Sequence, residues 1–443
     1  MFATVEEGFD FCESFVNVER GAYSPRRWRL ERMRALLQAF GDPHRAYPTI
    51  HVTGSKGKGS TAAYAAHILH AAGHRVGLYT SPHVESYRER VRVLDGSLTD
   101  DVFLAAFERI AAWANDQRRR VRAEELPTTF ELVTLLAFLV FREVGCAFAS
   151  IEVGLGGRLD ATNLVRPIVS VITPIELEHT EYLGPTLRSI AGEKAAIIKR
   201  GTPVVVSRQH PESMHVIERV AQLRRSSLTR IESIGDVESR LDGLSTTVRF
   251  TTPRIGRVES SLRMLGSTQA SNAALATLAI DIALPDTRGA AVELGLRETW
   301  LPGRSEILAG SPALLVDGAH TPDSVALVCE TARALCPDRN KRAIIFGSVA
   351  GKAHAQMLEH VVETFDSIVI CEPGTFKPSD PEALAAICRQ LGKPCTVIDG
   401  GADAIAHAVS LIGASDGLIV GCGSFYLAGK LRAAHRTGAE HVA

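Results

Sequence analysis

The sequence lacks the features that define several protein classes. Its eight cysteines include no C-x-x-C pair, so we expect reduced, buried thiols rather than disulfides or a zinc site. The longest apolar run, near residues 132–141, is too short to cross a bilayer. Residues 1–7 contain no charged region followed by an apolar core, so we expect no signal peptide. These absences predict a cytoplasmic protein.

An excess of charge of one sign is also absent. Lys and Arg number 49 and Asp and Glu number 50, which gives a formal net charge of −1. No basic field favours nucleic acid and no polybasic run favours a membrane. The short basic clusters at 26–29 and 118–120 are expected to be solvated helix or loop surface. The expected partners are therefore small molecules, with no nucleic acid and no membrane, and the chain is expected to be a monomer.

Two blocks of the chain show the alternation of an α/β protein. The 443 residues, 45% of them hydrophobic, are enough for more than one domain. Apolar strands alternate with amphipathic helices over most of the chain, and strands separated by helices predict parallel sheets. The predicted strands cover 49–53, 75–79, 147–153, 168–173 and 203–207, then 313–316, 342–346, 367–371, 396–398 and 417–421. The predicted helices cover 60–72, 101–113, 130–144, 186–199, 269–283 and 426–436.

A polar stretch separates the two blocks. Residues 208–262 are rich in Ser, Thr and Arg, and the alternating piece at 245–251 predicts a small β excursion. The Pro302-Gly303 turn marks the joint before the second, smaller block. Two α/β domains leave a cleft between them, which is a usual place for substrates.

The most informative segment is His-Val-Thr-Gly-Ser-Lys-Gly-Lys-Gly-Ser at 51–60. An apolar strand runs into a glycine-rich loop with lysine, and a helix follows. That order builds a phosphate cradle from backbone N–H groups and a helix N-terminus. Lys58 is expected to reach the outer phosphates, and a hydroxyl at Ser60 or Thr61 to touch Mg²⁺. A plain flexible turn is the alternative, because this loop is shorter than the common P-loop; the flanking strand and helix favour a nucleoside triphosphate site.

Polar residues also follow three other predicted strands. Glu152 ends an apolar strand, where a carboxylate suits Mg²⁺; the alternatives are a glycine turn or a dinucleotide loop. His179 lies beyond the next strand and completes a metal site with Glu152 if it is not a structural histidine. Ser81 is a candidate metal or phosphate ligand, although a Ser-Pro turn explains it equally well.

Four more residues are candidates by their positions. Lys194 is expected to be buried, because Ala-Ala-Ile directly follows it. In the second block, Asp317 and His320 follow a strand and are expected to face the cleft. Arg304 follows the Pro-Gly joint, where a guanidinium reaches a phosphate. The alternative for Arg304, Asp317 and His320 is ordinary turn chemistry.

Further motifs extend this pattern along nearly the whole chain. The motifs lie at 32–37, 51–60, 77–83, 89–92, 129–131, 152–163, 179–180, 183–184, 193–195, 269–272, 302–304, 317–320 and 421–426. In this order they resemble the folylpolyglutamate synthase/dihydrofolate synthase family of the Mur ligase superfamily. The resemblance implies a P-loop-containing parallel-sheet ATPase domain over residues 1–298. It implies a smaller Rossmann-like α/β domain over residues 299–443.

The resemblance assigns roles to the candidate residues. It implies that the ATP phosphates are held by Gly54, Ser55, Lys56, Gly57, Lys58, Gly59 and Ser60, with Asn272, Arg304 and Asp317 holding ATP from both sides of the cleft. It places Mg²⁺, in one or two ions, at Ser81, Glu152 and His179, and implies carbamylation of Lys194. Phe130 corresponds to the pteridine side and His320 to the glutamate side. The catalytic residues implied are Lys58, Glu152, His179 and Lys194.

The implied reaction joins glutamate to dihydropteroate, to folates, or to both. ATP converts a carboxylate to an acyl phosphate, the amine of glutamate attacks it, and domain closure excludes water. An alternative is another Mur-type ligase with a different carboxylate and amine. A further alternative is a nucleotide-binding homologue that has lost catalysis.

The sequence departs from the family pattern at four places. Ser55-Lys56 stands where Thr-Asn is usual, Glu178 where Asp precedes the histidine, and Thr321 where Asn follows His320. The acidic Asp-Lys-Asp motif is replaced by Gly-Lys-Ala at 351–353. The loss of two carboxylates predicts either an amine acceptor other than glutamate or a slow enzyme.

Overall fold

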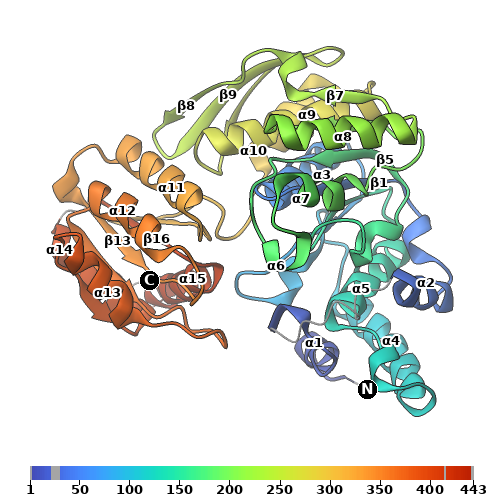
Figure 1. The fold of residues 1–443 in the computed structure, drawn as a ribbon, viewed down its shortest axis with the longest axis horizontal. Coiled ribbons are helices and arrows are strands. Elements are labelled where there is room, and N and C mark those ends of the chain that lie inside the picture. The colour runs from blue at the N-terminus through green and yellow to red at the C-terminus, as the bar shows by residue number, and fades with distance from the viewer. Residues whose placement is uncertain (1, 21–29, 414–415, 441–443) are drawn as a thin grey trace.

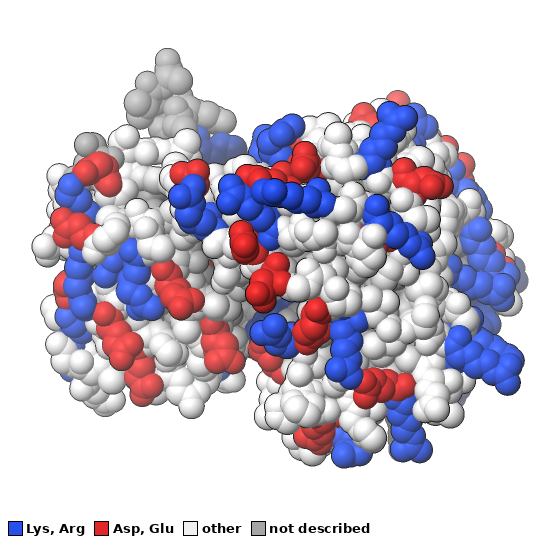
Figure 2. Space-filling view, turned by 90° about the horizontal axis from the view of Figure 1, so that it is seen from above, with Lys and Arg blue, Asp and Glu red and all other residues white. Residues whose placement is uncertain are grey.

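The computed structural model describes residues 2–20, 30–413 and 416–440. The basic cluster at 26–29 therefore lies outside the described residues, whereas the side chains of the cluster at 118–120 are exposed at the end of a helix. Two α/β lobes lie side by side, with the N-terminal lobe in blue to yellow and the C-terminal lobe in orange to red (Figure 1). On the face shown in Figure 2, basic and acidic side chains are interspersed and the surface is hollowed between the lobes.

The N-terminal lobe contains a seven-stranded sheet with the order β3-β2-β4-β1-β5-β6-β7. All pairs are parallel except β2 with β3. The strands are β1 (Thr49–Thr53), β2 (Val76–Tyr79), β3 (Val91–Val93), β4 (Phe148–Glu152), β5 (Pro167–Ile172), β6 (Val204–Val206) and β7 (Leu228–Arg230). Every residue of the central β1 is buried, which explains its continuous run of apolar and β-branched residues.

Helices cover both faces of this sheet. They are α1 (Val5–Glu13), α2 (Leu30–Ala39), α3 (Lys58–Ala71), α4 (Asp100–Arg120), α5 (Thr129–Glu143), α6 (Thr180–Leu183), α7 (Leu187–Ala195), α8 (Pro211–Arg224), α9 (Ser267–Ala283) and α10 (Gly289–Glu298). One apolar core joins α1, α2, α4 and α5, and a second joins α3, α9 and α10. The loop between β1 and α3 therefore rests on a strand and a helix that are fixed by packing.

A small antiparallel sheet lies beside α9 at the top of Figure 1 and confirms the predicted β excursion. Its strands are β8 (Glu238–Asp242), β9 (Ser245–Thr252) and β10 (Gly256–Leu262). The alternation of buried and exposed residues along β9 is the pattern seen in the sequence. The same stretch also contains α8 and β7, which the sequence analysis did not predict, because its polar composition hides the buried face of α8.

The C-terminal lobe is a six-stranded sheet with the order β11-β12-β16-β13-β14-β15. Its strands are β11 (Glu306–Leu308), β12 (Ala313–Val316), β13 (Arg342–Phe346), β14 (Ser367–Cys371), β15 (Thr396–Ile398) and β16 (Leu418–Cys422). Its helices are α11 (Pro322–Leu335), α12 (His354–Thr364), α13 (Pro381–Gln390), α14 (Gly401–Ile412) and α15 (Phe425–Glu440). The fold class predicted from the sequence is confirmed, while the domain limit between 298 and 299 stays a prediction.

The cysteines and the helices agree with two further expectations. All eight cysteines are free; seven are buried and Cys395 is partly exposed. In the described part of the chain, no helix combines the length and the apolarity that crossing a membrane requires.

Candidate active site

The nucleotide loop connects β1 to α3. The N–H groups of residues 58–60 open the helix and therefore have no acceptor within it, whereas Thr61 N already donates to Gly57 O at 2.9 Å. These three amides lie at the positive end of the helix and can bind an anion. The sequence analysis expected the whole loop to face the anion. The N–H groups of Ser55 and Lys56 donate to Pro174 O at 2.7 and 3.4 Å, so contacts of these two residues with the phosphates stay a prediction.

Close contacts explain the three glycines of the loop. A Cβ on Gly54 would lie 1.8 Å from Thr173 Oγ1, and one on Gly57 would lie 2.3 Å from Asn272 Oδ1. Gly57 also adopts φ +79°, a left-handed conformation that favours glycine. A Cβ on Gly59 would lie 3.0 Å from Glu152 Oε2. The loop is therefore pressed against β5, α9 and the end of β4, and Asn272 and Glu152 lie beside it.

Glu152 is a buried carboxylate next to the nucleotide loop. Its Oε2 accepts the Ser81 N–H at 2.8 Å, and Oε1 has no hydrogen-bond partner among the described residues. Burial raises the pKa of Glu152, and the charges of Lys58 and Arg304 oppose that rise. Lys58 Nζ itself donates to Ser55 O at 3.3 Å, so the side chain is folded back over its own loop. The structure thus brings Lys58, Ser81 and Glu152 together.

Lys194 is held against the other side of the loop. Its side chain is 1% exposed, and Nζ donates to Gly54 O at 2.6 Å and to Glu178 Oε1 at 3.0 Å. Burial lowers the pKa of Lys194 to about 8. Burial also opposes ionisation of Glu178, but Lys58 and Lys194 outweigh it and bring the pKa of this carboxyl to about 2. The burial expected from the sequence is confirmed; the pairing with Glu178 was missed, because Glu178 was noted only as a departure.

His179 begins α6 in a left-handed conformation with φ +48°. Burial lowers its pKa, the negative charge of Glu178 opposes that shift, and Lys58 and Lys194 lower it further. The His179 ring therefore lies close enough to Glu178, Lys58 and Lys194 to feel their charges. Among the described residues, no three His, Cys, Asp or Glu side chains form a cluster that could hold a metal ion by themselves. The pairing of His179 with Glu152 at one metal stays a prediction.

Residues of the C-terminal lobe complete the group. The Arg304 guanidinium lies 4.0 Å from the centre of the Phe425 ring and forms no ion pair or hydrogen bond with any described residue. Burial lowers the pKa of Arg304, while Glu152 and Asp317 raise it. The Asp317 carboxylate accepts hydrogen bonds from the N–H and the hydroxyl of Ser305 and from the N–H of Ala319. Arg304 is therefore a cation near Glu152 of the N-terminal lobe and Asp317 of the C-terminal lobe, with no ion pair to either.

His320 has a defined proton position. Its Nδ1 lies 2.8 Å from Gly318 O, and a carbonyl only accepts, so Nδ1 carries the proton and Nε2 is an acceptor. Burial, with the charges of Lys56 and Lys352, lowers the pKa of His320 to about 3. A neutral imidazole whose Nε2 is an acceptor can hold an amine by a hydrogen bond, although its low pKa makes it a weak base.

Phe130 lies in the first turn of α5, against the glycine turn that follows Glu152. Its ring packs against Gly154, where a Cβ would lie 2.4 Å from Cζ, and its centre is 6.2 Å from that of Tyr79. The neighbouring Glu131 is structural: it caps α5 at Thr128 and accepts Arg32 Nε at 2.8 Å. The role of Phe130 at the pteridine side therefore stays a prediction.

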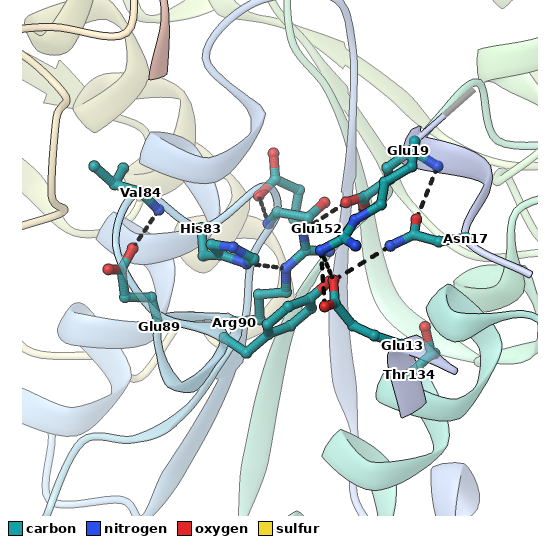
Figure 3. Close-up of polar contacts among 12 residues, drawn as sticks. Glu13, Asn17, Glu19, His83, Val84, Glu89, Arg90, Thr134 and Glu152 are labelled. Carbon is teal, nitrogen blue, oxygen red and sulfur yellow. Dashed lines mark hydrogen bonds and ion pairs between the residues drawn. The ribbon is translucent and has the colours of Figure 1, made fainter. Parts of the chain in front are cut away.

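A buried arginine near Ser81 was missed by the sequence analysis. Arg90 binds Glu19 through two hydrogen bonds of 2.8 and 2.7 Å and donates from Nε to His83 Nδ1 at 2.8 Å (Figure 3). Glu89 accepts the N–H groups of residues 84–86. The loop that carries Ser81 is therefore fixed by its own residues and by the N-terminal segment. The motif at 89–92 was the available signal, but sequence spacing does not reveal which residue pairs with Arg90.

The comparisons with known proteins define first a class. Residues 52–280 match the Mur ligase middle domain, and residues 303–425 match the Mur ligase glutamate ligase domain. The chain therefore has the domains of a Mur ligase. Individual relatives then show which family of Mur ligases it belongs to.

Two curated relatives and one solved structure are similar over most of the chain. The probable bifunctional folylpolyglutamate synthase/dihydropteroate synthase of Haloferax volcanii is 33% identical over 91% of this chain, which spans 48% of that protein. Folylpolyglutamate synthase of Lacticaseibacillus casei is 32% identical over 90% of this chain and 93% of its own length. The structure of Mycobacterium tuberculosis folylpolyglutamate synthase complexed with ADP has a TM-score of 0.87 at 28% identity, covering 98% of both chains.

The chain spans about half the length of the haloarchaeal relative but nearly all of the Lacticaseibacillus one. It belongs to the folylpolyglutamate synthase/dihydrofolate synthase family, a family of ligases that form carbon–nitrogen bonds.

Proposed function

We propose that this protein is an ATP-dependent ligase that joins L-glutamate to a folate or dihydropteroate acceptor. The observation that carries the proposal is the convergence of Lys58, Glu152 and Arg304 from both lobes on one glycine loop. Unpaired cations beside a helix N-terminus suit a triphosphate. The names of the relatives support folate and glutamate as the other substrates.

The reaction that fits these residues has two steps. An oxygen of the acceptor carboxylate attacks the γ-phosphorus of ATP, forming an acyl phosphate and releasing ADP. The nitrogen of glutamate then attacks the acyl carbon, the amide forms, and phosphate leaves. Lys58 and Arg304 stabilise the charge on the transferring phosphoryl group. His320 Nε2 accepts a hydrogen bond from the attacking amine, and the proton that the amine loses passes to the departing phosphate.

Mg²⁺ fits the donors that the structure offers. Glu152 presents an oxygen without a hydrogen bond, and the hydroxyls of Ser81 and Ser60 lie on the adjoining loop and helix. Mg²⁺ in phosphoryl-transfer sites commonly uses one or two carboxylates and takes its other ligands from phosphates and water. When bound, the ion neutralises phosphate charge; Glu152 and Ser81 would hold it, and His179 is the further proposed ligand.

The carbamylation of Lys194 is part of the proposal. Only a neutral amine adds carbon dioxide, and a pKa of about 8 leaves a larger neutral fraction than an ordinary lysine has. The added carboxylate would replace the bonds from Nζ to Gly54 and Glu178. Carbon-13 NMR of the native protein in carbon-13-labelled bicarbonate buffer measures the carbamate directly, with Lys194→Arg as the unmodifiable control.

The proposed function is tested by turnover. Purified protein with ATP, Mg²⁺ and glutamate should release ADP and phosphate only when dihydropteroate or a folate is added, and the product should contain one more glutamate. Lys58→Ala should reduce turnover by at least about 100-fold, because it removes a cation from the transferring phosphate. Acceptor-independent release, or full turnover in Lys58→Ala, would exclude the proposal.

A further inference from the structure

Ser81 is held from both sides by a single residue, Arg90. The carbonyl of Arg90 accepts the N–H of Thr80, directly before Ser81, at 3.1 Å. The side chain of Arg90 donates from Nε to Nδ1 of His83, two positions after Ser81, at 2.8 Å. The main chain and the side chain of Arg90 therefore bracket the residue whose own N–H donates to Glu152 Oε2 at 2.8 Å.

The guanidinium of Arg90 is buried and bound at both ends. The side chain is 3% exposed, and its two terminal nitrogens donate to the two carboxylate oxygens of Glu19 at 2.8 and 2.7 Å. Figure 3 shows the Arg90 side chain between His83 and Glu19. The guanidinium also lies 4.9 Å from the centre of the Tyr87 ring. A pair with two parallel hydrogen bonds fixes the orientation of the guanidinium as well as its charge. Glu19 therefore sets the direction in which Arg90 Nε points.

Glu19 belongs to a segment that packs against α5. The carbonyl of Val16 accepts the N–H of Thr129, the first residue of α5, at 3.1 Å. Glu13, at the end of α1, accepts the hydroxyl of Tyr87 at 2.5 Å. These contacts fix the position of the Glu19 carboxylate relative to the loop that carries Ser81.

We propose that Arg90 is a positioning residue for Ser81 and that Glu19 fixes Arg90, so that the pair orients the Ser81 hydroxyl towards the Mg²⁺ of a bound nucleotide. Within the described residues, neither Arg90 nor Glu19 forms a hydrogen bond or an ion pair with the nucleotide loop at 54–60, so the pair acts through Ser81. The inference rests on the proposed function, because it takes Ser81 as a Mg²⁺ ligand.

The test measures how much Mg²⁺ strengthens nucleotide binding. AMPPCP, an analogue of ATP that is not hydrolysed, is titrated into the full chain by calorimetry, once with Mg²⁺ and once with EDTA. The ratio of the two Kd values is the Mg²⁺ gain. We expect Glu19→Gln to reduce this gain about tenfold, the size of effect seen when a residue that orients a metal ligand is replaced. The Kd in EDTA should not change, whereas a merely structural role would weaken binding equally under both conditions.

A second variant removes the effect of an unpaired buried charge. Glu19→Gln leaves the Arg90 guanidinium without its counter-ion, which lowers stability. The double variant Glu19→Gln/Arg90→Gln removes both charges, and it should show the same reduced Mg²⁺ gain because nothing then holds His83. Arg75→Gln is the matched control, since Arg75 pairs with Asp95 at 2.7 Å across the other ends of β2 and β3. Its Mg²⁺ gain should equal that of the wild type.

These outcomes do not depend on turnover. A reduced Mg²⁺ gain in the double variant supports the positioning role even if no folate or dihydropteroate is turned over by the wild type. A wild-type gain in the double variant would overturn the positioning role and leave the proposed function intact. Binding of AMPPCP to the wild type that Mg²⁺ does not strengthen would also overturn it.

Discussion

At the scale of the residue, Arg304 shows how a charge is kept available for a ligand. Its nearest neighbour is the face of Phe425 rather than a carboxylate, and Asp317 is satisfied by three other donors. A guanidinium on an aromatic face keeps its N–H groups free at the ring edges. Phe425 is therefore a positioning residue, which the sequence analysis quoted within a motif but did not assign.

We predict that Arg304→Lys raises KM for ATP about tenfold, because an ammonium neither stacks on Phe425 nor binds two phosphate oxygens at once. Steady-state kinetics at varied ATP measures the effect. Arg297→Lys is the control, since Arg297 is exposed and pairs with Glu298 far from the nucleotide loop in sequence. An unchanged KM in Arg304→Lys would show that this side chain does not contact the nucleotide.

A second residue-scale prediction concerns His44, which is 4% exposed. Burial lowers the pKa of His44 to about 4, below its ordinary value of 6.5. The unfolded chain therefore binds a proton more readily between these two values, so stability is lost as pH falls from 6.5 to 4. We expect His44 to account for up to about 3 kcal/mol of that loss. Urea unfolding of the wild type and His44→Gln at pH 7 and pH 4.5 checks it: the variant should lose less stability.

Single residues also show what a sequence can predict. Lys58 and Glu152 were identified because each follows an apolar strand at the predicted ligand edge. The pairs Lys194–Glu178 and Arg90–Glu19 were not, because their members are 16 and 71 positions apart. Such pairing depends on how loops fold together, which residue order alone does not reveal.

At the scale of the element, strands buried in the middle of a sheet were predicted best. β1, β12, β13 and β14, each of which has a strand on both sides, agree with the sequence to the residue, and so does the edge strand β15. β3 and β11 were missed; each is three residues long and joins its sheet in antiparallel fashion at an edge. Short edge strands lack the long apolar run that identifies a central strand.

The turn from β1 to α3 gives a prediction at this scale. Gly57→Ala forces a left-handed alanine and places its Cβ 2.3 Å from Asn272 Oδ1, so it should abolish tight ATP binding and cost about 1–2 kcal/mol of stability. Gly73→Ala is the control: φ is +93° but no atom lies within 4 Å. It should cost about 1 kcal/mol and leave ATP binding unchanged. Thermal unfolding with and without ATP separates the two effects.

At the scale of the whole molecule, α15 connects the lobes. Arg432 lies in an ion pair with Glu306 at 2.7 Å and also binds Glu85, which belongs to the loop that carries Ser81. Gly429 lies against the same loop, where a Cβ would be 2.4 Å from Val84 O. Residues of α15 therefore contact the loop that carries Ser81 directly.

We predict that Arg432→Gln destabilises the protein by about 2 kcal/mol or more, because it removes the ion pair with Glu85 across the lobes and leaves the buried Glu306 of its own lobe without its cation. Calorimetry should show the two lobes unfolding at separate temperatures. Arg119→Gln, which removes an exposed ion pair with Asp116, should leave the unfolding profile unchanged. A single unaltered transition in Arg432→Gln would mean that the ion pair of Arg432 with Glu85 does not hold the lobes together.

The buried cysteines have a practical consequence. Because seven of the eight thiols are shielded from solvent, a thiol-reactive dye can modify them only when the chain around them opens. Their positions are distributed over both lobes, so the labelling of each thiol reports the opening rate of its own neighbourhood. The native cysteines can therefore serve as probes of local opening. Mass spectrometry of labelled peptides can measure the labelling rate of each thiol without any engineered probe.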